Sequence, residues 1–137
     1  MNEKWVPFHV PSIGEEEIAA VSQTLRSGWL TTGSKVKEFE AQFAERVGAK
    51  HAVATNSGTA ALHIALEALG VREGDEVIVP TMTFAATAEV ALYLKAKPIL
   101  IDCEPCTLNL DLDALERAIT SRTRAIMPVH FGGHPCE

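Results

Sequence analysis

A short glycine-containing segment, residues 55–62 (TNSGTAAL), carries residue types that bind phosphate. We expect it to follow a strand and to open a helix, with Gly58 allowing a close approach to the backbone and with Ser57 and Thr59 adding hydroxyl donors. The free N–H groups and the positive dipole end at a helix start attract anions. The segment therefore predicts a phosphate site. The alternative is that Ser57 only caps the helix.

An aromatic side chain, Phe84, comes shortly after the apolar run 76–79. At the carboxyl end of a strand, such a ring can stack on a flat ligand. A phenylalanine at the start of an apolar helix is, however, usually a core residue. The sequence leaves both interpretations open.

Cysteine and histidine occur at spacings that suit zinc: Cys103 and Cys106 form C-x2-C, and His130 and His134 form H-x3-H. The spacer between the two pairs is about twice as long as in zinc fingers. A redox pair needs the start of a helix, whereas the residues around Pro105 favour a loop. A binding module with a metal or redox site here is our second hypothesis.

The segment 28–35 (GWLTTGSK) nearly matches a phosphate-binding loop of nucleotide triphosphatases. Its serine and lysine are transposed, and a helix is expected before it in place of a buried strand, so we exclude that function. Trp29, with Thr31 and Thr32, remains a candidate to line a pocket or an interface, because a tryptophan in a loop is a common anchor.

The elements that position these residues change in character near Gly48. Before it, apolar periodicity predicts two amphipathic helices, the first capped by an S-x-x-E box from Ser12 to Glu15 and ended by Gly28. After it, continuously apolar runs at 51–55, 76–79, 98–101 and 124–129 alternate with helical patterns at 60–69, 84–94 and 112–119. This alternation predicts an α/β fold with a mostly parallel sheet, whose strands are covered on both faces. Ligands of such sheets lie beyond the carboxyl ends of the strands.

Composition excludes several classes. The chain has 137 residues, 47% of them hydrophobic, and a net charge of −6. It is too apolar for a disordered protein, and its negative charge disfavours nucleic acid as a partner. No run is long enough for a membrane helix, so we expect no membrane partner. Three cysteines and no secretion signal favour a reducing, cytoplasmic location.

Eight segments together resemble a known family. In order along the chain they are GWLTTG (28–33), FE (39–40), NSGTAAL (56–62), GDEVIVP (74–80), TMTFAAT (81–87), KP (97–98), ITSRTR (119–124) and PVHFGGHP (128–135). This order resembles the N-terminal part of the pyridoxal-phosphate-dependent sugar aminotransferases of the DegT/DnrJ/EryC1/StrS family. One difference is Lys95, which stands where family members usually carry glycine.

The resemblance implies a fold and a function. Residues 1–48 would form an N-terminal helical segment with an active-site loop, and residues 49–137 an incomplete large domain of a fold-type I aminotransferase. The whole enzyme would be a homodimer. It would transfer an amino group from an amino-acid donor, such as glutamate, to a keto group on a nucleotide-linked sugar for surface polysaccharides or antibiotics. Some relatives use the same scaffold for sugar dehydration.

The resemblance also assigns roles to residues. Ser57, Gly58 and Thr59 would hold the phosphate of pyridoxal phosphate, and Phe84 would stack on its pyridine ring. His130 is expected to end a strand at the cofactor face and to lie near the substrate.

The loop with Trp29, Thr31 and Thr32 would lie near the sugar substrate and the dimer interface. The family's Schiff-base lysine is expected downstream, and none of the lysines from Lys4 to Lys97 matches its motif. We therefore expect the 137-residue chain alone not to transaminate. We also expect unpaired strand edges and exposed apolar faces, and hence low stability or self-association.

Overall fold

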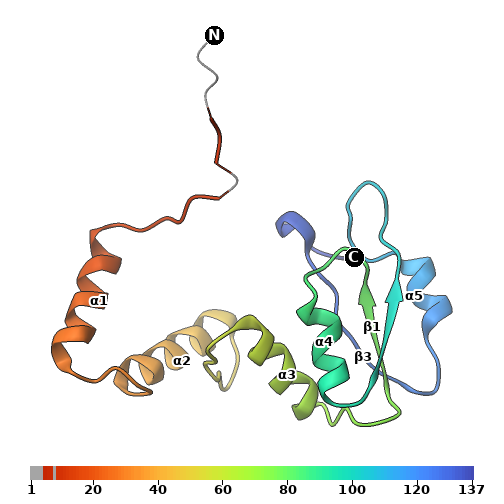
Figure 1. The fold of residues 1–137 in the computed structure, drawn as a ribbon, viewed down its shortest axis with the longest axis horizontal. Helices are drawn as coiled ribbons and strands as arrows, with labels where there is room; N and C mark the ends of the chain where they lie inside the picture. Colours follow the sequence, from red (N-terminus) through yellow and green to blue (C-terminus); the bar gives the residue numbers. More distant parts are fainter. Residues whose placement is uncertain (1–4, 8) are drawn as a thin grey trace. The chain divides into compact units, whose positions relative to one another are not determined.

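A computed structural model describes residues 5–7 and 9–137, and the chain divides into two compact units, 1–54 and 55–137 (Figure 1). Residues 1–4 and 8 lie outside the described residues, and with them Lys4 and part of the predicted segment 1–48. Within the described part of the chain, no helix combines the length and the apolar character needed to cross a membrane.

The first unit contains the two predicted helices, α1 (Glu15–Ser27) and α2 (Ser34–Val47). Both end as predicted at glycines in the left-handed conformation, Gly28 with φ 73° and Gly48 with φ 67°. Only glycine adopts this conformation at little steric cost. The chain direction after each helix is therefore fixed locally by one residue.

The start of α1 differs from the prediction of a capping box at Ser12 and Glu15. The N-cap is Gly14, whose N–H donates to Glu17 Oε2 at 2.6 Å. This hydrogen bond from the backbone lowers the pKa of Glu17. Glu17, at the third position of the helix, thus supplies the half of a capping box that accepts from the N-cap N–H. The helix begins two residues later than predicted, because Gly14 and not Ser12 is the N-cap.

The predicted strand at residues 51–55 is wrong: the described backbone there is not part of a sheet. Instead, the N–H of Ala54 donates to the carboxylate of Glu40 at 2.9 Å, and the side chain of Val53 is 73% exposed. A strand exists only where another strand pairs with its backbone groups. Apolar character alone therefore predicted a strand at 51–55 for which the described residues form no pairing partner.

The second unit is the predicted α/β structure with a parallel sheet. Its elements are α3 (Gly58–Ala68), β1 (Glu76–Pro80), α4 (Ala86–Tyr93), β2 (Lys97–Ile101), α5 (Leu112–Ala118), β3 (Thr123–Ile126) and the 3-10 turn η1 (Phe131–Gly133). The strand order is β2-β1-β3, with both neighbours parallel to β1. The central strand thus comes first in sequence.

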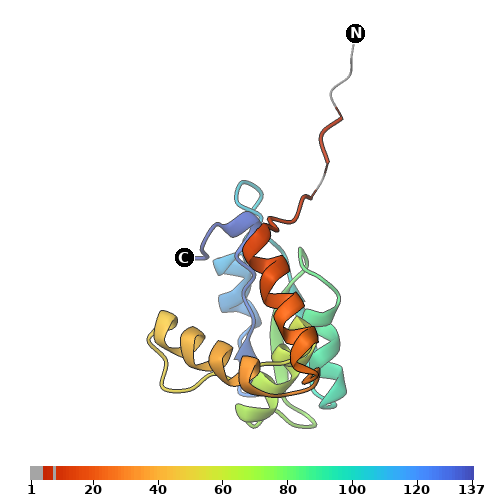
Figure 2. The same cartoon turned by 90° about the vertical axis from the view of Figure 1, so that its left-hand side faces the viewer.

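The sheet with β1 is the middle one of three layers. Val77 and Val79 face one core with Val90 of α4, whereas Ile78 faces the opposite core with Leu115 of α5. Figures 1 and 2 show α4 and α5 on the two faces of the sheet. Every residue of β1 is buried, as its continuous apolar run predicted.

The outer strands differ from that prediction. Leu100 in β2 is 60% exposed and Ile126 in β3 is 41% exposed. Each of these strands has only β1 as a partner among the described residues. The expected unpaired edges and exposed apolar side chains are therefore present in the second unit.

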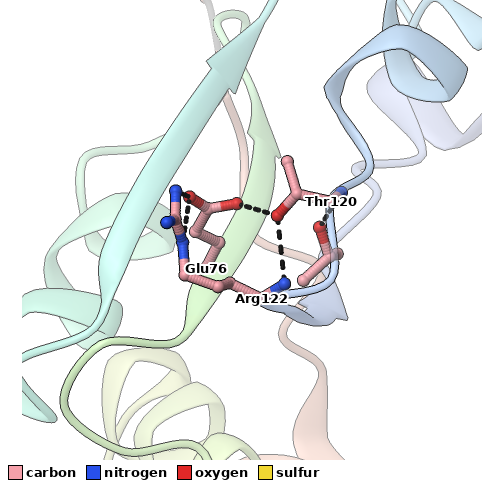
Figure 3. Close-up of polar contacts among 4 residues, drawn as sticks. Glu76, Thr120 and Arg122 are labelled. Carbon is pink, nitrogen blue, oxygen red and sulfur yellow. Dashed lines mark hydrogen bonds and ion pairs between the residues drawn. The ribbon is translucent and has the colours of Figure 1, made fainter.

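A polar cluster closes the amino end of β1 (Figure 3). The carboxylate of Glu76, in a residue only 3% exposed, accepts from Thr120 Oγ1 at 2.6 Å and from Arg122 Nε and Nη2 at 3.0 and 2.6 Å. The hydrogen bond from Thr120, followed by the interactions with Arg122, lowers the pKa of Glu76. The cluster therefore fastens the segment between α5 and β3 to the central strand.

This cluster predicts a dependence of stability on pH. Because the pKa of Glu76 is lower in the folded than in the unfolded chain, its stabilisation is full above the ordinary value of 4.5 and is lost as the pH falls through the folded value. Glu76→Gln should therefore lower the free energy of unfolding at pH 7, with a deficit that shrinks below pH 4.5. Urea unfolding from pH 7 to pH 3 measures it, with the exposed Glu116→Gln as control. A deficit that does not change with pH would contradict the prediction.

The turn after α4 contains a strained residue. Lys95 has φ 57°, in the left-handed region, and its N–H donates to Leu92 O at 2.9 Å. The family resemblance had singled out this position as one where glycine is usual. Its ion pair with Glu73, at 4.0 Å between two exposed side chains, contributes little.

Lys95→Gly should raise the free energy of unfolding by about 0.5–1 kcal/mol, because relief of the left-handed strain exceeds the entropy that glycine loses on folding. Lys95→Ala removes the same side chain and keeps the strain, so it is the matched control. Urea unfolding of both variants measures the difference. Equal stability of the glycine and alanine variants would show that the turn is not strained.

Candidate functional site

The first turn of α3 has the geometry of an anion site. Ser57 is the N-cap: its Oγ accepts from the N–H of Ala60 at 3.1 Å, and its carbonyl accepts from the N–H of Ala61 at the same distance. Among the described residues, the N–H groups of Gly58 and Thr59 have no hydrogen-bond partner. The capping role of Ser57 and a phosphate site are thus compatible, because the cap leaves two donors free.

The electrostatics of this turn favour an anion. The first turn of α3 contains no acidic residue, in contrast to α1, which carries three glutamates there. A Cβ built on Gly58 would meet nothing within 4 Å, so the space beside this backbone is open. A helix dipole that no carboxylate neutralises keeps its attraction for a negatively charged group.

An open pocket of about 740 Å³ adjoins this turn. Its lining comes from α3 and from the start of α4: Gly58, Thr59, Ala61, Leu62, Ala65, Phe84, Ala86 and Thr87. All of these side chains are neutral, and most are apolar. The volume lies within the range of sites for small ligands and cofactors.

Phe84 forms part of the wall of the same pocket and is 79% exposed. Its backbone is held where α4 begins, because its carbonyl accepts from the N–H of Thr87 at 3.0 Å. The core interpretation of Phe84 is therefore wrong. An exposed ring on a fixed backbone, in a pocket shared with free N–H donors, can stack on a flat ligand.

Sequence reasoning missed the contribution of Thr87 to this pocket. Its side chain is buried and its Oγ1 lies 2.7 Å from Thr83 Oγ1, a pairing that ties the loop after β1 to α4. The signal was present in TMTFAAT, because Thr83 and Thr87 are four residues apart. This spacing brings side chains together only if the loop continues directly into a helix.

His130 lies beyond the end of a strand, so the prediction that it ends one is wrong. β3 stops at Ile126, and His130 precedes η1. Its Nδ1 accepts from the N–H of Cys136 at 3.1 Å. The N–H of Met127 still donates to Ile78 O at 2.9 Å, but Pro128 has no N–H with which to continue the pairing. The chain then turns at Gly132 and Gly133, which have positive φ.

The Trp29 loop belongs to the first unit and forms a pocket of its own, of about 340 Å³, with the end of α1 and the start of α2. The indole Nε1–H donates to Thr32 O at 3.0 Å. A Cβ on Gly33 would overlap the indole ring of Trp29. The glycine is therefore needed for the ring to fold against the loop, while Thr31 and Thr32 are exposed.

Lys35 ends the sequence that resembles a triphosphate-binding loop. Its Nζ pairs with Glu38 Oε2 at 2.9 Å, and helix α1 precedes the loop where a strand would be required. Both features agree with the exclusion of that function.

The cysteine and histidine pairs do not assemble a metal centre. Among the described residues, no three or more histidine, cysteine or acidic side chains come together as ligands, and Cys103 and Cys106 are free thiols. The cysteine pair lies in a loop well before α5, where Glu104 accepts from the N–H of Cys106 at 3.0 Å. This hydrogen bond and the one from Thr107 lower the pKa of Glu104. The structure therefore gives no support to the second hypothesis.

Comparisons with known proteins agree with the sequence motifs. The model of the DegT/DnrJ/EryC1/StrS aminotransferase family matches residues 11–137. The spore coat polysaccharide biosynthesis protein SpsC of Bacillus subtilis is 52% identical over 133 residues, which cover 97% of this chain and 34% of SpsC. The chain thus spans about a third of the length of this relative.

Solved structures give the same result. The putative sugar aminotransferase Spr1654 from Streptococcus pneumoniae, in its PMP form, is 45% identical with a TM-score of 0.90 over 96% of this chain and 33% of its own. A GDP-4-keto-6-deoxymannose-3-dehydratase with a trapped PLP-glutamate geminal diamine is 32% identical, with a TM-score of 0.87 over 95% of this chain and 35% of its own.

The fold is therefore that of the N-terminal part of the large domain of fold-type I aminotransferases, as the resemblance implied. The cofactor of this family is pyridoxal phosphate, and Spr1654 is known in PLP and PMP forms. Residues 11–137 match the family model and the α/β unit has its fold; the chain belongs to the DegT/DnrJ/EryC1/StrS aminotransferase family.

Proposed function

We propose that this chain supplies the cofactor platform of a transaminase that acts on a nucleotide-linked keto sugar. The observation that carries the proposal is the single pocket that joins two free N–H donors, those of Gly58 and Thr59, to the exposed ring of Phe84. One wall of the pocket can bind an anion and the other can stack on a flat ring, and pyridoxal phosphate has both a phosphate and a flat ring. The family's cofactor thus fits the groups that the chain presents.

Each side chain has a distinct task in this proposal. The free N–H groups and the hydroxyl of Thr59 bind the phosphate, and Ser57 keeps the first turn of α3 in place. Phe84 orients the pyridine ring, and the apolar wall at Leu62 excludes water from it. When bound, the cofactor supplies an electron-accepting ring that stabilises charge next to the amino nitrogen.

No lysine of the described residues, 5–7 and 9–137, lines the pocket, so we do not assign the Schiff base to this chain. We propose that residues 1–137 alone do not transaminate. The platform and the covalent chemistry would then be separate contributions to one enzyme, because binding the phosphate and ring does not require the lysine.

The substrate assignment rests on relatives. SpsC is named for polysaccharide biosynthesis, Spr1654 for sugar aminotransfer, and the dehydratase for a GDP-linked keto sugar with glutamate on its cofactor. We propose a nucleotide-linked sugar as acceptor, glutamate as donor, a homodimer in the cytoplasm, and a place near the sugar for Trp29, Thr31, Thr32 and His130. Dehydration of the sugar is the second candidate, because a dehydratase shares this scaffold.

The cofactor platform can be tested with pyridoxamine phosphate, which has no aldehyde and so forms no adduct with surface lysines. We expect weak, non-covalent binding of pyridoxamine phosphate. Pyridoxamine, which lacks the phosphate, should bind with at least about tenfold lower affinity, because charged groups make the stronger hydrogen bonds to free N–H donors. Phe84→Ala should weaken binding by about threefold to tenfold through lost stacking. Calorimetric titration measures each affinity.

Phe39→Ala is the matched control, because Phe39 is also an exposed phenylalanine but does not line the pocket. Equal affinity for the two ligands would exclude the phosphate site. Equal loss in the two phenylalanine variants would exclude the ring platform.

The substrate loop can be tested through Trp29. Gly33→Ala should displace the indole from Thr32, because the added Cβ would occupy the position of the ring. In a Trp5→Phe background, the emission of Trp29 should shift to the red and acrylamide should quench it more strongly. Ser34→Ala, the neighbouring exposed position, serves as the control. Unchanged emission in Gly33→Ala would show that the loop does not depend on this contact.

A further inference from the structure

Asn109 is a buried side chain that the proposed function does not use. It lies in the loop between β2 and α5, is 6% exposed, and makes three hydrogen bonds to the segment after β3. Its Oδ1 accepts from the N–H of Phe131 at 3.0 Å, and its Nδ2 donates to the carbonyls of His134 and Pro135, both at 3.1 Å. One side chain thus bonds to residues near both ends of the segment that we call the turn 130–136.

The loop that carries Asn109 is itself fixed. Cys103 and Leu110 form an antiparallel bridge, and the N–H of Glu104 donates to Asn109 O at 2.9 Å. The N–H of Asn109 donates to Thr107 Oγ1 at 3.2 Å. Because its backbone is bonded on both sides, Asn109 can act as an anchor rather than follow the turn it contacts.

The turn that Asn109 holds determines the tautomer of the His130 ring. Its Nδ1 accepts from the N–H of Cys136, so the neutral ring carries its proton on Nε2. The Sγ of Cys136 donates to Val129 O at 3.3 Å and closes the turn. The bonds from Asn109 to His134 and Pro135 place Cys136 where it can make this contact.

The topology places this turn at the proposed cofactor edge. β3 is a parallel neighbour of β1, so the chain after β3 leaves the sheet at the same edge as Phe84, which follows β1. Ligands of parallel sheets bind at this edge.

We propose that Asn109 is a positioning residue, which fixes the turn 130–136 and presents the Nε2–H of His130 at the carboxyl edge of the sheet. This inference rests on the proposed function for what is bound at that edge. A buried asparagine with a merely structural role would change stability when substituted and would leave the ring of His130 in a single tautomer.

Asn109→Asp is the sharpest variant, because the side chain keeps its shape and the acceptor for Phe131 but loses both donated hydrogen bonds. Asn109→Ser shortens the side chain and adds no charge, so it separates loss of the hydrogen bonds from the effect of a carboxylate. Val71→Ala, in the core cluster that contains Val77, Val79 and Val90, is the control for general loss of stability. Nitrogen NMR of the full chain near pH 8, assigned through His130→Gln, gives the tautomer of neutral His130.

In the unmutated chain, we expect one Nε2–H tautomer of His130 and slow hydrogen exchange at the N–H of Phe131. Both Asn109 variants should give mixed tautomers and about threefold weaker binding of pyridoxamine phosphate, whereas Val71→Ala should change neither. Fast exchange at Phe131, which requires no variant, would overturn the anchor. A single tautomer in an Asn109 variant that folds would also overturn it.

The two proposals fail in different ways. Mixed tautomers with unchanged binding of pyridoxamine phosphate would overturn the positioning role at the cofactor edge. Absence of binding by the unmutated chain would overturn the cofactor platform and with it that role. The NMR signals would still decide whether Asn109 holds His130.

Discussion

The burial of β1 is the constraint on which the second unit depends. Its five residues are buried, its two faces contact different cores, and both of its edges are paired. A backbone without access to water must have all of its polar groups bonded within the protein, and parallel pairing on both sides achieves this. The flanking helices then have fixed positions, because each packs against side chains that alternate along this one strand.

The two ends of β1 serve opposite purposes. At the amino end, Glu76 binds Thr120 and Arg122, so a charged group is fully bonded and the segment before β3 is fastened. At the carboxyl end, the chain opens into Phe84 and the free donors of α3, where hydrogen-bonding and stacking capacity remains unused by the protein. Closing one end and leaving the other open is how a parallel sheet combines stability with a ligand site.

The chain spans about a third of the relatives it matches, and its surface agrees with a need for further contacts. Leu100 and Ile126 expose apolar side chains on the outer strands, and Phe39 and Phe43 of α2 contact each other at 5.8 Å between ring centroids while both remain exposed. Apolar surface of this extent is typical of interfaces.

Local signals in the sequence determined much of this protein. Gly28 and Gly48 ended their helices because left-handed backbone is a property of one residue, and Ser57 capped α3 because its hydroxyl bonds three residues away. The order of eight motifs determined the family, since none of them alone is specific. The proposed phosphate turn rests on residues 57–59, which are adjacent in sequence, whereas its pocket with Phe84 is a feature of the fold.

Only the tertiary structure decided the features that need a distant partner. It left 51–55 without a strand, since Ala54 bonds Glu40 instead, and it exposed Phe84, which sequence alone could not distinguish from a core residue. It also joined Asn109 to a turn more than twenty residues away. Strand pairing, exposure and long-range hydrogen bonds depend on which groups the fold brings together, and no local pattern contains that information.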